Sequence, residues 1–168
     1  MGDDEGRQGQ GVSREALSVR IRPITPADAA EWLRMREALW PEGKADHQPE
    51  IERYFQGQLR EPLEVLLAID DRGQAVGFAE LSIRTYAEDC VTDHIAYLEG
   101  WYVEPLARRQ GVGRALVAGA EEWARAQGCT EFASDALLDN DVSAVAHQAL
   151  GFEETVQLRC FRKSLGHS

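Results

Sequence analysis

The chain has 168 residues, of which 43% are hydrophobic, and a formal net charge of −11 at pH 7. This length fits one domain with a sizeable core and is too short for two independent catalytic domains. No apolar run approaches the roughly 20 residues that cross a bilayer, and an acidic surface disfavours nucleic acid, so we expect neither a membrane segment nor a nucleic-acid partner.

The chain begins with a charged, glycine-rich segment that lacks the apolar stretch of a signal peptide. We expect residues 1–17 to form a flexible tail and residues 18–168 to form a single domain. Alternating apolar and polar residues predict a strand over Val19–Ile24. Thr25-Pro26-Ala27-Asp28 then offers an N-cap, a proline at the first helical position and an early acid, so we expect a helix that ends at Trp40-Pro41.

A polar loop over residues 42–49 separates this helix from a second one, which the sequence predicts over Pro49–Leu59. Two apolar runs follow, Val65–Ile69 and Ala75–Ile83. The residues Asp70-Asp71-Arg72-Gly73 lie between them and include the glycine that tight turns need, so we expect an antiparallel hairpin.

The second half of the chain alternates strands with helices. An apolar strand over Ile95–Val103 precedes a helix from Gly113 to about Gln127, which Gly128 stops. Further elements are expected over Thr130–Ser134 (strand), Val142–Leu150 (helix) and Thr155–Lys163 (strand). This order predicts a mixed α/β fold in which helices cover one central sheet.

The cysteines and histidines show no ligand spacing. Cys90, Cys129 and Cys160 are odd in number and form no C-x-x-C pair, which argues against a disulfide framework or a zinc site. The four histidines lack the H-E-x-x-H spacing. We therefore expect no metal site, and a reducing, cytoplasmic location.

The most informative motif is V-E-P-L-A-R-R-Q-G-V-G-R, residues 103–114, between the strand and the helix. Gly111 and Gly113 have no Cβ to obstruct a ligand, so backbone N–H groups at the start of the helix are free to point at phosphate oxygens. Positive charge is added by Arg108, Arg109 and Arg114. The alternative is an ordinary helix start after a turn, with no ligand.

This spacing lacks both the Lys-Ser/Thr ending of the ATP-binding P-loop and the third glycine of dinucleotide-binding folds. It resembles the acetyl-CoA pyrophosphate loop of the GCN5-related N-acetyltransferase (GNAT) superfamily. The signature positions fall on Val103, Pro105, Arg108, Gly111 and Gly113. The Leu150-Gly151-Phe152 ending of the last helix is a second family feature.

Short segments spread over the domain are similar to one branch of this superfamily, the aminoglycoside 6'-N-acetyltransferases. They are ALWP at 38–41, GFA at 77–79, SIR at 82–84, LEG at 98–100, ASD at 133–135 and HQALGFEET at 147–155. The resemblance implies the GNAT fold, a central mixed and mostly antiparallel sheet flanked by helices. It also implies acetyl-CoA as co-substrate, a cationic aminoglycoside as acceptor, antibiotic resistance, and a homodimer.

The resemblance further implies which residues bind acetyl-CoA. In this fold the strand before the glycine loop splays from its neighbour and exposes backbone N–H groups to the pantetheine arm and the thioester carbonyl. The implied contacts are Trp101, Tyr102 and Val103 on the strand, Arg108, Arg109, Gln110, Gly111, Val112, Gly113 and Arg114 in the loop, and Asn140 and His147 near the last helix. For Asn140 an ordinary Asp-Asn-Asp turn is the alternative.

Acetyl transfer to an amine needs a neutral amine, a polarised carbonyl and a stabilised thiolate. Acidic residues gather in the segment 80–99, which suits a polycationic acceptor. We expect Glu99 to be catalytic, anchoring the ammonium and accepting its proton, and Asp135, at the end of the next strand, to be a second acid in the same cleft. The alternatives are an arginine partner for Glu99 and a helix-cap role for Asp135.

Trp40 and Tyr86 are candidate walls of the acceptor pocket, because aromatic faces attract ammonium groups; packing is the alternative. His147 occupies the position at which many family members carry a tyrosine that protonates the thiolate. His147 is therefore a catalytic acid, a contact to CoA or a packed residue. Two other functions stay open: acetylation of another amine, such as a polyamine or a protein N-terminus, and noncatalytic binding of acyl-CoA.

Overall fold

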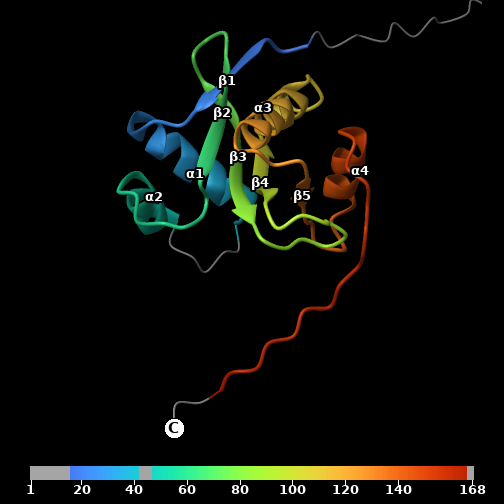
Figure 1. The fold of residues 1–168 in the computed structure, drawn as a ribbon. Helices are drawn as coiled ribbons and strands as arrows, with labels where there is room; N and C mark the ends of the chain where they lie inside the picture. The colour runs from blue at the N-terminus through green and yellow to red at the C-terminus, as the bar shows by residue number, and fades with distance from the viewer. Residues whose placement is uncertain (1–15, 42–46, 166–168) are drawn as a thin grey trace, which may run out of the picture.

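The computed structural model describes residues 16–41 and 47–165 and shows a five-stranded sheet with helices on both faces (Figure 1). The strands are β1 (Val19–Pro23), β2 (Glu64–Asp70), β3 (Ala75–Arg84), β4 (Ile95–Val103) and β5 (Phe132–Ser134). The helices are α1 (Ala29–Leu39), α2 (His47–Phe55), α3 (Val112–Ala126) and α4 (Asp141–Ala149), with short 3₁₀ turns η1 (Pro26–Asp28) and η2 (Pro105–Ala107). The strand order is β1-β2-β3-β4-β5; β4 and β5 run parallel and the other neighbours antiparallel. This mixed, mostly antiparallel sheet confirms the predicted fold class.

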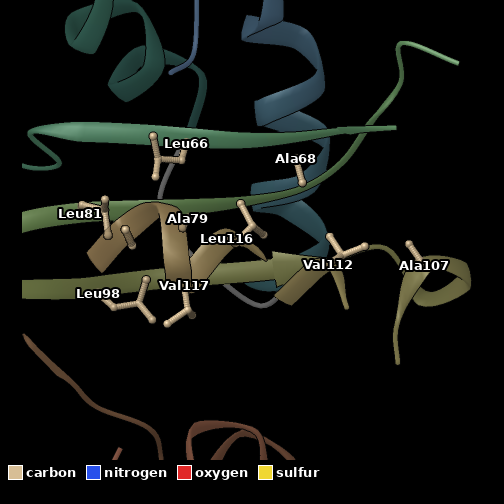
Figure 2. Packing of buried hydrophobic residues seen from close by; sticks show 10 residues of the cluster. Leu66, Ala68, Ala79, Leu81, Leu98, Ala107, Val112, Leu116 and Val117 are labelled. Atoms are coloured by element: carbon tan, nitrogen blue, oxygen red, sulfur yellow. The ribbon is translucent and has the colours of Figure 1, made fainter. Parts of the chain in front are cut away.

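Two hydrophobic cores lie on opposite faces of the sheet. On one face α3 packs with Leu116 and Ala120 fully buried, and on the other α1 and α2 pack around Trp32 and Met35 (Figures 1 and 2). Alternate residues of β2 enter the two cores: Val65, Leu67 and Ile69 join the α1 side, and Leu66 and Ala68 join the α3 side. Because β2 is buried on both faces, its interior is a continuous apolar run.

The residues predicted to open the first helix form the 3₁₀ turn η1 in front of α1, with Thr25 at its N-cap and Pro26 at its first position. The Asp28 carboxylate accepts hydrogen bonds from the backbone N–H and the hydroxyl of Thr25, at 2.8 and 2.7 Å. Arg22 of β1 donates two further bonds to Asp28, both 2.8 Å, and these hold the pKa of the Asp28 carboxyl well below its usual range. The entry to α1 is thereby tied to β1.

The second helix begins and ends earlier than the sequence predicts. The prediction is Pro49–Leu59, whereas α2 spans His47–Phe55. Gly57 takes φ +67, and its N–H bonds back to the Tyr54 carbonyl at 2.9 Å, so a glycine C-cap ends the helix before Leu59. Of the predicted loop 42–49, residues 42–46 lie outside the described residues.

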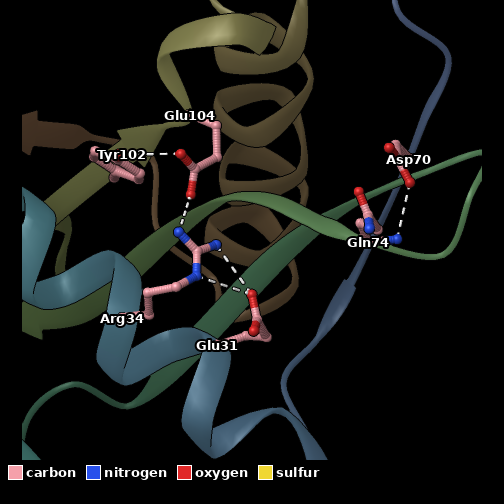
Figure 3. Close-up of polar contacts among 6 residues, drawn as sticks. All are labelled: Glu31, Arg34, Asp70, Gln74, Tyr102 and Glu104. Atoms are coloured by element: carbon pink, nitrogen blue, oxygen red, sulfur yellow. Dashed lines mark hydrogen bonds and ion pairs between the residues drawn. The ribbon is translucent and has the colours of Figure 1, made fainter.

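The predicted hairpin between β2 and β3 is confirmed. Gly73 takes φ +79, a backbone angle that favours glycine. Asp70 closes the turn, because its carboxylate accepts a hydrogen bond from the backbone N–H of Arg72 at 2.9 Å and one from that of Gln74 at 2.8 Å. The second of these bonds is drawn in Figure 3.

The prediction of a last strand over Thr155–Lys163 is wrong. After α4, residues 152–165 have no regular secondary structure; Phe152 still packs against Phe132 and His147, and the chain beyond it runs away from the body of the molecule (Figure 1). A strand needs a neighbouring strand for its backbone N–H and C=O groups, and within the described residues this segment pairs with none. Its apolar side chains are consequently exposed, Phe161 to 92%.

The predicted tail, residues 1–17, lies outside the described residues except for Ala16 and Leu17. Leu17 packs against the core and donates its N–H to the Gln110 carbonyl at 3.0 Å, so the folded part of the chain includes it. In the described ranges, none of the helices combines the length and the apolar character that a bilayer crossing demands.

Candidate active site

The loop between β4 and α3 presents an open helix end. Arg109 and Gly111 take positive φ values of +61 and +89. No side chain of the described residues caps the N-terminus of α3, and the first N–H groups of a helix lack partners within it. Together with the helix dipole and the exposed side chains of Arg108, Arg109 and Arg114, these N–H groups favour an anion.

Side chains from two neighbouring elements hold this loop in place. Glu104, which precedes η2, forms an ion pair with Arg34 of α1 and accepts a hydrogen bond from the Tyr102 hydroxyl at 3.3 Å (Figure 3). Arg108 donates from Nε to the Val103 carbonyl at 2.9 Å. The loop is therefore anchored to α1 and to the end of β4.

The two glycines of the loop have different roles. A Cβ at Gly111 would meet no atom within 4 Å, so this position requires glycine for its backbone angle and leaves the adjoining space open. A Cβ at Gly113 would lie 3.0 Å from the ring of Trp101. Gly113 thus lets Trp101 of β4 pack against the start of α3, a contact that the spacing of the motif does not reveal.

β4 separates from β5 beside this loop. Their parallel pairing ends at the pair Leu98–Ser134. Residues 99–103 continue along β3, but in the described chain they have no β5 partner on their other side. The edge of β4 over Trp101–Val103, where the resemblance implies a splayed neighbour, therefore has no partner strand on that side in the described chain, and it leads to the N-terminus of α3; we call this unpaired edge the gap.

Glu99 occupies a β-bulge in β4. The register with β3 passes from the pair Leu98–Leu81 directly to the pair Gly100–Glu80, so Glu99 is the extra residue between them. A bulge re-aims the side chain at the inserted position. The Glu99 carboxylate consequently reaches the side chains of Ser82 and Arg84, which lie two and four residues after Glu80 on β3.

The chain itself supplies partners for the Glu99 carboxylate. It accepts a hydrogen bond from the Ser82 hydroxyl, one from Arg84 Nε at 3.0 Å and one from Arg84 Nη2 at 2.6 Å. The Arg84 guanidinium also lies over Tyr97, 3.4 Å from the ring centroid. The structure thus shows the arginine partner that was the alternative for Glu99. The Glu99 side chain nevertheless remains 20% exposed.

Asp135 joins this cluster from the end of β5. Burial and then the Asp135 carboxylate raise the pKa of the Tyr97 hydroxyl, which places Asp135 beside Tyr97. The helix-cap alternative for Asp135 is wrong, because Asn140 caps α4 by accepting a hydrogen bond from the Ser143 N–H at 3.0 Å. Glu99 and Asp135 therefore both lie near Tyr97 and Arg84, and we call these two carboxylates the acidic cluster.

The ring of His147 is engaged at both nitrogens. Nδ1 lies 2.8 Å from the Ser143 carbonyl oxygen and Nε2 lies 3.0 Å from the Ser134 hydroxyl. The ring also packs edge-on against Trp101 and Phe152, at centroid distances of 5.5 and 5.2 Å. His147 thus holds α4 against the end of β5 and against the part of β4 that lies beside the gap.

The two predicted aromatic walls differ in environment. Trp40, at the end of α1, packs against the Gly100 backbone, and the Arg36 guanidinium lies 5.3 Å from its ring centroid. Gly100 follows Glu99 directly, so Trp40 borders the cluster. Tyr86 lies in the loop after β3 and is 70% exposed.

Sequence reasoning missed a buried acidic network next to Trp40. Glu80 of β3 is almost fully buried and accepts a hydrogen bond from the Trp32 indole N–H at 2.8 Å. Arg36 Nε lies 2.8 Å from the same carboxylate as an ion pair, and Arg36 also donates to Glu50 of α2 at 2.9 Å. Burial raises the pKa of Glu80 to about 7, against the lowering effect of Arg36.

Sequence reasoning also left Ser82, Arg84 and Tyr97 out of the site. The available signal was spacing, because residues 80, 82 and 84 alternate along one strand and therefore share a face of the sheet. The register between β3 and β4, which pairs Ser82 with Tyr97, then brings Glu99 to the same face.

The comparisons with known proteins agree with this geometry. The model of the acetyltransferase (GNAT) family matches residues 32–152. The aminoglycoside N(6')-acetyltransferase type 1 of Klebsiella aerogenes is 56% identical over 146 residues, which are 86% of this chain and 96% of that protein. The crystal structure of an aminoglycoside antibiotic 6'-N-acetyltransferase from Acinetobacter baumannii is 41% identical, with a TM-score of 0.80 over 89% of this chain and 100% of that one.

A further solved structure, AAC(6')-Iy in complex with the bisubstrate analogue CoA-S-monomethyl-acetylneamine, is 36% identical, with a TM-score of 0.79 over 88% of this chain and 99% of that one. The family model spans most of the chain, and the relatives match it over nearly their whole length. The chain therefore belongs to the acetyltransferase (GNAT) family.

Proposed function

We propose that this chain is an aminoglycoside 6'-N-acetyltransferase, which transfers acetyl from acetyl-CoA to an amine of a cationic aminoglycoside and so confers antibiotic resistance. One observation carries the proposal: the gap between β4 and β5 lies between the anion-favouring start of α3 and the acidic pair Glu99 and Asp135. Relatives named for this activity support it, one of them at 56% identity.

On the acetyl-CoA side we assign the diphosphate to the start of α3. The open space at Gly111 and the uncapped helix end support this assignment. The residues assigned to the cofactor are Arg108, Arg109 and Arg114 for charge, Gln110, Gly111, Val112 and Gly113 for backbone contacts, Trp101, Tyr102 and Val103 beside the gap, and Asn140 and His147 on the α4 side.

On the acceptor side Glu99 anchors the ammonium and takes its proton. The amine attacks a thioester carbonyl only after losing a proton, and the bulge presents the Glu99 carboxylate beside the β4 gap, where it accepts that proton directly or through water. Asp135 adds negative charge across Tyr97 for the polycation. Trp40 and Tyr86 border the acceptor.

We assign His147 a positioning role rather than that of thiolate acid. Nδ1 faces the Ser143 carbonyl oxygen and Nε2 faces the Ser134 hydroxyl, which itself donates to the Leu98 carbonyl at 3.1 Å. Both ring nitrogens are thus engaged by groups of the chain itself, which supports a structural role for the ring.

Release of CoA from acetyl-CoA in the presence of kanamycin or tobramycin tests the function, with the mass of the product read in parallel. We expect one acetyl group on the drug, and growth of a sensitive bacterium on the drug when it expresses the chain. Turnover of polyamines or peptide N-termini without turnover of either drug would assign the chain to another amine. Affinity for acetyl-CoA with no turnover at all would make it a binding domain.

Glu99→Gln tests the assigned base. We expect kcat/KM for tobramycin to fall by about a hundredfold or more, since general-base catalysis contributes on this order, with unchanged affinity for acetyl-CoA. Glu121→Gln on α3, which removes the same charge from an exposed pair with Arg125, is the matched control. Equal activity of the Glu99 variant and the parent would remove Glu99 from the mechanism.

We also propose a homodimer, with residues 152–165 as part of its interface. The segment leaves the body of the molecule and exposes Val156, Leu158, Phe161 and Leu165. Its sequence predicts a strand, and a second copy would supply the missing partner. Light scattering on the full chain and on a chain that ends at Glu154 tests this: a dimer is expected for the first and a monomer for the second, and a monomer for both rejects it.

We further propose a cytoplasmic location without a nucleic-acid or membrane partner. Cys90, Cys129 and Cys160 are free, as proteins of a reducing compartment keep their thiols. The net charge of −11 works against binding to polyanions. Fractionation of the expressing cells, with recovery of activity from the cytoplasmic fraction, is the expected result.

A further inference from the structure

Arg84, the last residue of β3, places a positive charge next to the acidic cluster. Its guanidinium holds Glu99 through two hydrogen bonds, at 3.0 and 2.6 Å, and lies 3.4 Å from the ring centroid of Tyr97. Burial lowers the pKa of Arg84, but the Glu99 and Asp135 carboxylates outweigh it and raise that pKa. An aromatic face beside two carboxylates is an environment that binds organic cations, and here a cation of the chain itself occupies it.

The contacts of Glu99 allow the guanidinium to be replaced. The Arg84 side chain is 35% exposed and lies at the end of its strand, so it has solvent on one side. The Ser82 hydroxyl is a second donor to Glu99 and does not depend on Arg84. Departure of the guanidinium would therefore leave the Glu99 carboxylate oriented and with its Arg84-binding oxygens free to accept another donor.

We propose that Arg84 is an internal cation that fills the ammonium subsite formed by Glu99, Asp135 and Tyr97, and that the acceptor amine binds by displacing it. This inference rests on the proposed acetylation of a cationic amine. It makes Arg84 a specificity residue: a monocation must compete with the tethered guanidinium, whereas a polycation brings several charges to the same acidic cluster.

Arg84 could instead serve to position Glu99, and this role predicts a different effect on amine binding. If Arg84 served to position Glu99, its removal would lower kcat and leave amine affinity unchanged or weaker. If Arg84 competes with the amine, its removal strengthens amine binding, because one positive charge leaves a site that the ammonium must enter. Affinity for the amine therefore separates the two roles.

Calorimetry of tobramycin binding to the parent and to Arg84→Gln is the deciding experiment, because it needs no turnover. We expect the Kd of the amine to fall by about tenfold in the variant, while the Kd of acetyl-CoA and the melting temperature stay close to those of the parent. Arg84→Lys keeps a charge and should bind the amine nearly as the parent does. Arg125→Gln on α3 controls for the change in net charge.

Added guanidinium chloride, at concentrations well below those that unfold the protein, gives a second readout. In Arg84→Gln we expect guanidinium to compete with tobramycin and weaken its apparent affinity, more than it does in the parent. Arg84→Met, uncharged and of similar length, is the second variant if Arg84→Gln does not fold. Unchanged or weaker amine binding in the folded variant, or a rate that guanidinium restores, overturns the inference. Failure of the parent to acetylate any drug would instead contradict the proposed function.

Discussion

Trp40 fills the space that a side chain at Gly100 would need. A Cβ at position 100 would lie 2.7 Å from Cη2 and 2.8 Å from Cζ2 of the indole. Gly100 directly follows the bulged Glu99, so this contact joins the end of α1 to the point at which β4 presents its carboxylate. The indole is held in turn by Arg36, whose guanidinium lies 5.3 Å from the ring centroid.

Gly100→Ala is expected to lower the free energy of unfolding by roughly 1–3 kcal/mol, because the added methyl group overpacks a filled space. We expect a loss of activity as well, since the displaced backbone belongs to the bulge. Thermal unfolding and drug turnover measure the two effects. Trp40→Leu in the same chain should relieve the overlap, so a double-mutant cycle is expected to show strong coupling; simple additivity would contradict the contact.

Glu80 is expected to make the protein less stable as the pH rises from about 4.5 to about 7. Burial raises the pKa of Glu80 from 4.5 to about 7 in the folded chain. Within this window the folded chain keeps a proton that the unfolded chain releases, so the free energy of unfolding falls with increasing pH. Below the window both states hold the proton, and above it neither does.

Glu80→Gln removes this titration. We expect the variant to lack up to roughly 3 kcal/mol of the decline between pH 4.5 and 7, on top of any pH-independent change that the substitution itself causes. Urea unfolding of the variant and the parent across this range measures the difference in slope, with Glu121→Gln as the exposed control. Parallel curves would show that Glu80 does not titrate there.

Arg108→Ala is expected to weaken binding of acetyl-CoA by about tenfold, because a charge-assisted hydrogen bond to phosphate is lost. Arg125→Ala, at the far end of α3, removes an equal charge and should leave the affinity unchanged. Calorimetry with acetyl-CoA measures both. An intact affinity in the Arg108 variant would limit its role to the bond that it donates to the Val103 carbonyl.

His147→Gln is expected to lower kcat by less than about tenfold and to lower the melting temperature, because the ring joins α4 to Ser134 of β5 and to Trp101 of β4. Loss of a general acid costs about a hundredfold or more. Steady-state kinetics under saturating drug and acetyl-CoA distinguish the two roles. A hundredfold fall in kcat with an unchanged melting temperature would make His147 the thiolate acid.

The elements that carry local signals were predictable from the sequence. The capping residues Thr25 and Asp28, the turn glycine Gly73 and the strand before the glycine loop all act through neighbours within a few residues, so their pattern is sufficient. The end of α2 was missed because the left-handed Gly57 was not recognised as its cap. The last strand was predicted from propensity alone, and within the described residues it has no partner.

Local sequence was sufficient to place the glycine loop before a helix, Glu99 within a strand and Asp135 at the end of the next one, because glycine angles and strand alternation act over short distances along the chain. Which groups meet across the sheet depended on the register between β3 and β4. The bulge at Glu99, the hold of Arg84 on that carboxylate and the burial of Glu80 beneath α1 arise from this long-range pairing. A pairing between distant segments is decided by how the whole core packs, and no short stretch of sequence contains that information.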